Sequence, residues 1–287
     1  MSESNTTTDL SMNKTRGEIT VGRFLIPYRL FGRGDRILVC VNGAQQTMAA
    51  WKPVVTYFSR NYRLLLFDFP GQGRARINSG SPVVDLNEQV EVLRQVLLAQ
   101  PDHDGSIVAG ASWGGVVVAA FASRFPEMVD KIILASFGIR VNEKLVEAIE
   151  DGQRLNGTAT GEKIAEVIIK YFGQHLNDTF KKKMKNQFQY ITKEHLENFN
   201  AHGHLLKTAR HISEVVDLRS IKAQTLIING ALDTVMDRED VVLAAAQIAN
   251  CIVKIVPGVG HFLHNESDDV LEIYRDFLSL PAERQLS

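Results

Sequence analysis

The stretch Ser106-Ile-Val-Ala-Gly-Ala-Ser112-Trp-Gly-Gly-Val116 joins an apolar run to a helical pattern through a serine that is flanked by glycines. Residues 106–109 predict a buried strand, and the residues from Val116 onward predict a helix. Glycines two positions before and after Ser112 permit a sharp, strained turn between these two elements. A Gly-x-Ser-x-Gly turn in this setting presents the serine hydroxyl at the end of a strand, so Ser112 is a candidate nucleophile. The alternative is a glycine-rich turn with an incidental serine.

Further apolar runs on both sides of this stretch extend the pattern into a sheet. Strands are predicted at residues 24–30, 36–41, 63–67, 131–135, 225–228 and 252–256. Helices are predicted at residues 85–98, 237–249 and 267–278, and Asp85 and Glu88 match a capping box at the start of the first. Strands that alternate with helices predict an α/β fold with a mostly parallel sheet and helices on both faces.

One region breaks this alternation. Residues 139–217 show no convincing strand, and helical patterns occur at residues 143–150, 161–172, 179–188 and 193–198. We therefore predict an α/β core in two parts, residues 18–138 and 218–287, interrupted by a helical cap at residues 139–217. Residues 1–17 are rich in Ser, Thr and Asn, and we expect a disordered tail there.

Composition limits the classes of function. The chain has 287 residues, 23% of them charged, and a formal net charge of −1, so we expect no nucleic-acid partner. The longest apolar run, residues 116–122, is far below the ~18–20 residues that a membrane span needs, and the N-terminus lacks the apolar core of a signal peptide. We expect no stable membrane insertion and a cytoplasmic location. Cys40 and Cys251 have no metal-ligand spacing and are expected to be small buried residues on strands.

Two later loops supply the partners that a serine nucleophile needs. Asp233 follows the predicted strand at residues 225–228, and His261 follows the strand at residues 252–256 within Gly-Val-Gly-His-Phe. The chain order Ser, Asp, His is the order of the nucleophile-elbow hydrolases. His261 would take the proton of Ser112, and Asp233 would hold the imidazole in the required tautomer.

The oxyanion of such a reaction needs two hydrogen-bond donors. One expected donor is the backbone N–H of Trp113, which follows the nucleophile. The other comes from the loop after the strand at residues 36–41, where the sequence is Asn42-Gly43-Ala44, and we predict the N–H of Ala44.

Other polar residues compete for these roles. His264 is an alternative to His261, but the glycine-rich approach belongs to His261. Asp68 is expected to be a structural loop residue beside the nucleophile. The remaining candidates are histidines of the predicted cap, expected at the surface or at a pocket rim and not as metal ligands: His202, His204 and His211. No metal site is predicted.

A basic run, Lys181-Lys-Lys-Met-Lys185, lies in the predicted cap. A solvated helix face is the simplest interpretation. The alternative is a docking patch for an acidic carrier protein or for nucleotide phosphates, and the near-neutral charge of the whole chain makes a local cluster more informative.

Taken together, the chain resembles the α/β-hydrolase-fold family over nearly its whole length. Within it, the chain is similar to the rhamnolipid-precursor synthases, which join two 3-hydroxyacyl chains into a 3-(3-hydroxyalkanoyloxy)alkanoate, and to the 3-hydroxyacyl-ACP:CoA transacylases. The segments that carry this similarity are Val41-Asn-Gly-Ala44, Leu66-Phe-Asp-Phe-Pro70, Ala111-Ser-Trp-Gly-Gly115, Ile228-Asn-Gly-Ala-Leu-Asp233 and Gly260-His-Phe-Leu263.

The resemblance implies a serine acyltransferase that forms an acyl-enzyme on Ser112 from a 3-hydroxyacyl thioester. Acyl carrier protein or coenzyme A would carry the donor, and the mechanism requires no metal or organic cofactor. Asn42 and Gly43, together with the cap residues Val167 and Phe172, are the predicted substrate contacts, although simple packing explains the cap residues equally well.

Three alternatives stay open. A thioesterase or carboxylesterase would use the same triad with water as acceptor, and a transacylase would use a carrier thiol. A non-catalytic binding protein of the same fold is the third, and intact candidates at Ser112, Asp233 and His261 speak against it. After Asp233 the sequence continues Thr-Val-Met-Asp237, which departs from the Glu-Tyr-Thr-Thr that is typical of the similar enzymes.

Overall fold

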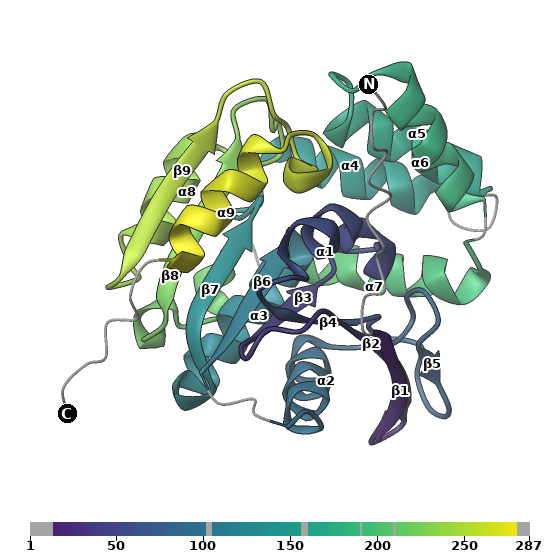
Figure 1. Ribbon diagram of the computed structural model, residues 1–287. Coiled ribbons are helices and arrows are strands. Elements are labelled where there is room, and N and C mark those ends of the chain that lie inside the picture. The colour runs from purple at the N-terminus through teal and green to yellow at the C-terminus, as the bar shows by residue number, and fades with distance from the viewer. Residues whose placement is uncertain (1–13, 102–104, 156–159, 190, 209–210, 280–287) are drawn as a thin grey trace, which may run out of the picture.

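One sheet of nine strands crosses the computed structural model, which describes residues 14–101, 105–155, 160–189, 191–208 and 211–279 (Figure 1). The spatial order is β1-β2-β4-β3-β6-β7-β8-β9, with β5 paired to β2. From β4 to β9 every pairing is parallel, while β1, β2 and β5 pair antiparallel, which confirms the predicted mostly parallel sheet. The strands are β1 (Lys14–Val21), β2 (Phe24–Phe31), β3 (Ile37–Val41), β4 (Arg63–Phe67), β5 (Arg76–Ile77), β6 (Ser106–Ala111), β7 (Val129–Ala135), β8 (Gln224–Gly230) and β9 (Cys251–Val256).

Helices cover both faces of this sheet. Successive strand residues point to opposite faces, so Val39 joins one core and its neighbour Cys40 joins the other. The first core packs against α2 (Leu86–Leu98), α3 (Trp113–Arg124) and α8 (Arg238–Ala245). The second packs against α1 (Lys52–Phe58) and α9 (Asp269–Ser279). The central strands are therefore held rigidly from both sides.

Helix α2 begins at the predicted capping box and reaches the helix that follows the candidate nucleophile. The carboxylate of Asp85 accepts the N–H of Glu88 at 2.8 Å, and Glu88 Oε2 accepts the N–H of Asp85 at 3.1 Å. Further along α2, Gln89 Oε1 accepts the indole N–H of Trp113 at 2.7 Å in a buried contact. The start of α3 is thereby fixed to α2.

The N-terminal prediction was wrong for residues 14–17. They belong to β1, which pairs with β2 along its whole length from Lys14 opposite Phe31 to Val21 opposite Phe24. Most β1 side chains are exposed, so the sequence carries little apolar signal, and the strand is defined by its backbone partner instead. The first 13 positions of the predicted tail lie outside the described residues.

The region between β7 and β8 is helical where the structure describes it. It contains α4 (Glu143–Arg154), α5 (Gly161–Phe172), α6 (Asp178–Phe188) and α7 (Lys193–Thr208), of which α4 to α6 gather at the upper right of Figure 1. Helix α5 has the predicted bounds, whereas α4 and α7 run further than expected. Between Ala135 and Gln224 the described residues form no strand, only an isolated bridge between Arg140 and His211. Among the described helices, none is long and apolar enough to cross a membrane.

Candidate active site

Ser112 lies at a strained turn between β6 and α3. Its backbone has φ 53° and ψ −120°, a conformation that L-residues rarely adopt, and its N–H donates to the carbonyl of Ala135 at 2.8 Å. The flanking glycines are required by space: a Cβ on Gly110 would lie 2.4 Å from the carbonyl oxygen of Gly114. A Cβ on Gly114 would lie 2.4 Å from the carbonyl oxygen of Val41. The turn therefore closes tightly against β3 and projects Ser112 from the sheet.

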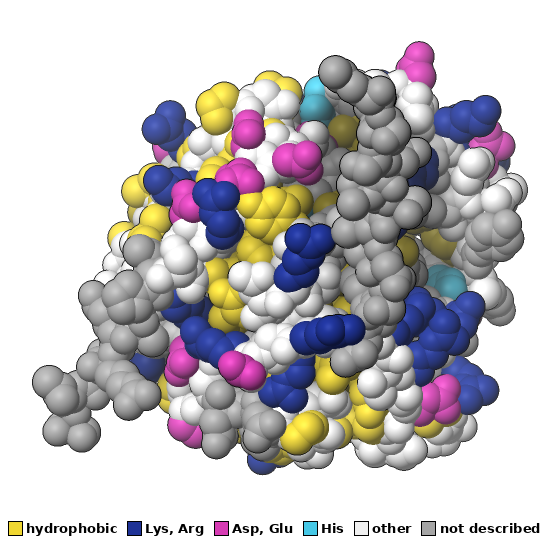
Figure 2. Space-filling view, viewed as in Figure 1, with side chains coloured by type: hydrophobic (Ala, Val, Ile, Leu, Met, Phe, Trp, Pro, Cys, Tyr) yellow, Lys and Arg dark blue, Asp and Glu magenta, His cyan; other side chains and the backbone are white. Residues whose placement is uncertain are grey.

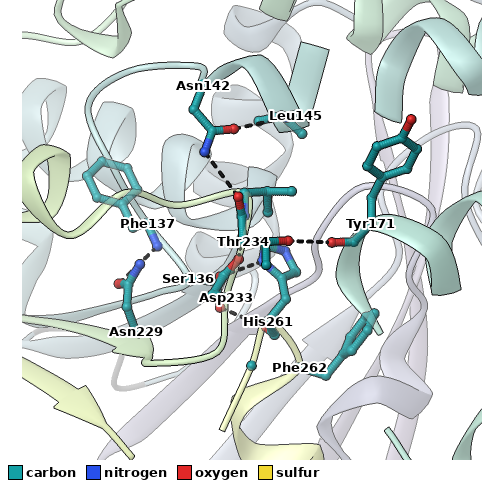
Figure 3. Close-up of polar contacts among 12 residues, drawn as sticks. Ser136, Phe137, Asn142, Leu145, Tyr171, Asn229, Asp233, Thr234, His261 and Phe262 are labelled. Carbon is teal, nitrogen blue, oxygen red and sulfur yellow. Dashed lines mark hydrogen bonds and ion pairs between the residues drawn. The ribbon is translucent and has the colours of Figure 1, made fainter. Parts of the chain in front are cut away.

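Asp233 and His261 are brought together from the loops after β8 and β9. His261 Nδ1 lies 2.8 Å from Asp233 Oδ2, and Figure 3 shows the contact. The Asp233 side chain is fully buried and the His261 side chain is 5% exposed, so the pair lies in a low-dielectric environment where such contacts are strong. The other oxygen of Asp233, Oδ1, accepts the N–H of Val235 at 3.0 Å, which fixes the carboxylate.

The candidate nucleophile and the candidate base border the same cavity. Ser112 and His261 both line a cavity of about 1040 Å³, slightly above the range of about 300–1,000 Å³ that is typical of ligand sites. The predicted oxyanion residues Ala44 and Trp113 line it as well. So do Gly43 and the cap residues Val167, Ile168, Phe172, Met184 and Phe188. Much of the wall is apolar, which suits a ligand with a hydrocarbon part.

The loop that carries Ala44 is held from below by polar side chains. Gly43 donates its N–H to Gln46 Oε1 at 3.1 Å, and a Cβ on Gly43 would lie 3.0 Å from the carbonyl oxygen of Ala111. In the amide orientation that satisfies its neighbours, the buried Gln72 donates to the carbonyls of Gly43 and Gln46. Gln45 has φ 59°, so the backbone turns sharply directly after Ala44. This loop is therefore fixed close to the serine turn.

Asn42 lies in a different place from the one predicted. Its side chain is fully buried and donates to the carbonyl of Phe67 at 2.9 Å and to Asp68 Oδ1 at 3.2 Å, and it is not among the residues that line the cavity. A short side chain that leaves the end of β3 lies level with the neighbouring strand β4, and its amide meets the polar groups there. This position favours a structural role for Asn42 in place of substrate contact.

Asp68 holds the same loop, in keeping with the structural role expected for it. Besides the amide of Asn42, its carboxylate accepts the N–H of Met48 at 2.7 Å and the N–H of Arg74 at 3.2 Å. Burial raises the pKa of Asp68 above its usual range, and these hydrogen bonds oppose that rise.

His264, the alternative base, is a buried residue of the core. Its ring stacks on Trp51 with centroids 4.6 Å apart, and its Nε2 lies 3.2 Å from the carbonyl oxygen of Ala50. Burial lowers the pKa of His264 to about 4, so the ring is neutral at physiological pH. His264 does not line the large cavity.

The remaining sequence candidates have varied positions. His204 and His211 are exposed, while the side chain of His202 lies outside the described residues. Among the described residues no group of His, Cys, Asp and Glu could hold a metal ion. Cys40 is buried in β3, and Cys251 is half-buried in β9, where burial raises the pKa of its thiol to about 11.

The basic run lies within α6, where Lys182 and Lys183 are exposed and Met184 is buried. Lys185 pairs with Glu162 and Glu166 of α5, and Lys181 donates to the carbonyl of Gln174 at 2.9 Å. Lys183 is exposed and borders the cavity. Figure 2 shows Lys and Arg side chains interspersed with Asp and Glu over the face in view, as expected for a chain with almost no net charge.

Several residues around His261 and Asp233 escaped the sequence analysis. Ser136, with φ 51°, donates its hydroxyl to the carbonyl of His261 at 2.7 Å (Figure 3). The hydroxyl of Thr234 donates to the carbonyl of Tyr171 at 2.9 Å. These contacts join segments far apart in the chain, so no local sequence pattern predicts them.

The mostly parallel sheet flanked by helices agrees with comparison to known proteins. Residues 38–273 match the model of the alpha/beta hydrolase family. The protein belongs to that family. Its fold is shared with MGS-M2, an alpha/beta hydrolase enzyme from a Medee basin deep-sea metagenome library, with a TM-score of 0.80, 22% identity, and coverage of 94% of this chain and 100% of that one.

Curated relatives of this alpha/beta hydrolase include enzymes with different names. An (R)-3-hydroxydecanoyl-ACP:CoA transacylase of Pseudomonas putida is 23% identical over 265 residues, which are 88% of this chain and 85% of the relative. This match confirms the similarity to the transacylase group. A 2-hydroxy-6-oxononadienedioate/2-hydroxy-6-oxononatrienedioate hydrolase of Escherichia coli is 28% identical over 272 residues, 87% of this chain and 89% of the relative. The relatives thus include one enzyme named as a transacylase and one named as a hydrolase.

Proposed function

We propose that this alpha/beta hydrolase is a serine acyltransferase that uses 3-hydroxyacyl thioesters to form a 3-(3-hydroxyalkanoyloxy)alkanoate. The observation that carries the proposal is the cavity of about 1040 Å³, which joins Ser112 and His261 to a largely apolar wall of cap residues. Transfer of a hydrocarbon chain from water to such a wall is favourable, by roughly 25 cal/mol per Å² of apolar surface buried. The similarity to a 3-hydroxydecanoyl transacylase supports the same donor class.

In the first half-reaction, Ser112 Oγ attacks the thioester carbonyl while His261 takes the serine proton. Asp233, 2.8 Å from His261 Nδ1, favours the tautomer whose other nitrogen accepts that proton and stabilises the imidazolium that forms. The N–H groups of Ala44 and Trp113 are proposed to stabilise the oxyanion. The C–S bond then breaks, the carrier sulfur receives the proton from His261, and an acyl-enzyme remains on Ser112.

In the second half-reaction, the 3-hydroxyl of another chain attacks the acyl-enzyme. His261 accepts the hydroxyl proton, the new ester C–O bond forms, and the proton returns to Ser112 Oγ as it leaves. Water is the competing nucleophile, so transfer requires that the acceptor displace water from the cavity. The apolar side chains of Val167 and Phe172 at its wall support exclusion of water.

Hydrolysis is the second candidate function, because several relatives are named hydrolases and the same three residues would serve. The cavity also contains polar side chains, among them Lys183 and His195, which could order water. In that case the acyl-enzyme would be released as a free acid.

The deciding experiment is mass spectrometry of the products formed by purified protein from a medium-chain 3-hydroxyacyl-ACP, with and without added CoA, repeated with the CoA thioester. An ester-linked dimer of hydroxy acids, absent with Ser112→Ala, is the expected result and identifies the preferred carrier. Acyl-CoA formed from acyl-ACP and CoA would establish transacylation instead, and free 3-hydroxy acid alone would establish a thioesterase. No product from either thioester would contradict the proposed substrate class.

A further inference from the structure

Glu266 holds the backbone on both sides of His261. Its Oε2 accepts the N–H of Gly260 at 2.7 Å, and its Oε1 accepts the N–H of Phe262 at 2.8 Å. The side chain is only 5% exposed, so its carboxylate is taken from water and satisfied by these donors. A carboxylate that spans two amides in this way fixes the direction of the residue between them, because rotation of His261 would break one hydrogen bond or the other.

The backbone carbonyl of the base itself is held as well. The hydroxyl of Ser136 donates to the carbonyl of His261 at 2.7 Å, in a loop after β7 that is itself strained at φ 51° (Figure 3). The imidazole of His261 is therefore positioned by its bond to Asp233 and by a backbone clamped from two sides. A displacement of about 1 Å in a catalytic group can cost about 10²-fold in rate, so this clamp bears on the chemistry.

The cap contributes the third contact of Glu266. His175, in the turn after α5, places its Nε2 2.7 Å from Glu266 Oε2, and its side chain is 22% exposed. The same ring lies directly over Gly260, where an added Cβ would meet it at 2.1 Å. A side chain at position 260 would displace this ring, so the glycine leaves room for His175 beside Glu266.

The neighbouring residues of the cap contact the other parts of the acid–base pair. The carbonyl of Tyr171, near the end of α5, accepts the hydroxyl of Thr234, the residue after Asp233 (Figure 3). The ring of Phe172 meets the ring of His261 edge to face, with centroids 4.8 Å apart. Residues 171–175 thus contact the acid loop, the base and the clamp of the base.

We propose that Glu266 is a positioning residue for His261 and that His175 links this clamp to the cap. On this proposal the cap both lines the cavity and orients the imidazole of His261, through the contact of His175 with Glu266. The proposal depends on the proposed function only for the role of His261 as the base, and not on the identity of the acyl chain or the acceptor.

The first test removes the clamp and reads the competence of the base. Glu266→Ala and Glu266→Gln are compared with Glu127→Ala, which changes an exposed glutamate far along the chain. The measurements are the rate of Ser112 labelling by a fluorophosphonate, kcat and KM for a thioester or a simple ester, and the melting temperature. We expect Glu266→Ala to lower kcat and the labelling rate about 10²-fold with KM changed less than about threefold. Glu266→Gln, which keeps an acceptor oxygen, should recover about tenfold of that loss, and Glu127→Ala should match the wild type.

The second test separates the cap contact from the packing of the ring. His175→Phe keeps a ring over Gly260 but loses the nitrogen that meets Glu266, whereas His175→Ala loses both. We expect His175→Phe to lower kcat about fivefold at unchanged melting temperature, and His175→Ala to lower it further. Because these changes lie on the surface of the cap turn, they test the link even if Glu266→Ala does not fold.

His261→Ala distinguishes the two proposals. If it labels at the wild-type rate, His261 is not the base and the proposed function is wrong. If it abolishes labelling while folded Glu266→Gln and His175→Phe label at the wild-type rate, the proposed function stands and the positioning role is overturned. The positioning role would also be overturned if the Glu266 variants lost kcat and labelling rate only in proportion to the fraction of protein that is unfolded.

Discussion

The sheet and the cap meet at one cavity, yet they are packed very differently. In β3 every residue is buried, and the candidate chemistry lies at the ends of β6, β8 and β9 on backbones fixed by neighbouring strands. In the cap, α6 buries only Met184, and among the described residues α5 buries Ile164, Ala165 and Tyr171. The candidate catalytic groups thus belong to the densely packed region, and the proposed contacts of an acyl chain belong largely to the sparsely packed one.

This difference teaches where each property of the enzyme should respond to change. Regions with few buried apolar contacts open and adjust at low cost in free energy, whereas a dense core resists. A substitution in the sheet should affect rate or folding, and one in the cap should affect which chain is accepted. The residues at the end of α5 contact both regions, so substitutions there should affect both the rate and the choice of chain.

The largest effect is expected at the nucleophile. Ser112→Ala should lower turnover by about 10⁴-fold or more, because the three residues act as a unit. The variant keeps the N–H that donates to Ala135 at 2.8 Å, so the melting temperature should change little. Steady-state kinetics with thermal unfolding checks both; substantial remaining turnover would exclude Ser112 as the nucleophile.

The next effect tests how densely the core surrounds the turn. Gly114→Ala would place a Cβ 2.4 Å from one backbone oxygen and 2.5 Å from another, so we expect about 3 kcal/mol of lost unfolding free energy. Gly115→Ala is the matched control, because its Cβ would meet the movable ring of Phe137 at 3.2 Å, and about 1 kcal/mol or less is expected. Urea unfolding measures both, and equal losses would contradict the tight closure of the turn against β3.

Below that in size is a pH effect from His264. The pKa of its ring is lowered from 6.5 to about 4 by burial, so the unfolded chain binds a proton that the folded chain does not. The contribution of His264 to the free energy of unfolding is fully present above pH 6.5 and is lost as the pH falls toward 4. At pH 5 the loss is roughly 2 kcal/mol. His264→Phe keeps a ring beside Trp51 and should flatten this part of the stability curve; parallel curves for the two proteins would show that His264 does not titrate this way.

The smallest effect is expected in the cap. Val167→Phe narrows the cavity wall and should change the preference between long and short acyl chains about tenfold, which corresponds to about 1.4 kcal/mol. Melting temperature should change little. Val146→Phe is the control, since Val146 is half-buried in α4 and does not line the cavity. Equal chain preferences in both variants and the wild type would remove Val167 from the substrate contacts.

The features that the sequence predicted well are those with a local physical signature. The glycines around Ser112 are required by the turn itself, and Asp85 with Glu88 satisfies neighbouring amides, so both could be recognised from spacing alone. The bounds of α5 were predicted because its apolar residues recur at helical spacing. Asp233 and His261 could be proposed because each follows an apolar run that predicts a buried strand.

The features that escaped prediction depend on partners distant in the chain. Glu266 meets His175 across 91 positions, and Thr234 meets Tyr171 across 63, with no spacing that announces either contact. The first residues of β1 were missed because a polar strand at the sheet edge is defined by β2. Asn42 was predicted to contact the substrate as part of the oxyanion loop, but its amide nitrogen donates to polar groups at the end of β4.

The place where the cap joins the core has a consequence for engineering. Strands β7 and β8 are adjacent and parallel. The cap follows β7 and precedes β8, and its two ends meet at the bridge between Arg140 and His211 and at the hydrogen bond from the N–H of Ile212 to the carbonyl of Ile139. An insertion whose two ends already touch imposes little strain on its host, whatever its length. The cap is therefore suited to exchange. We expect a cap from a relative, joined at this bridge, to bring its own chain preference to an unchanged sheet, provided that it supplies a partner for Glu266.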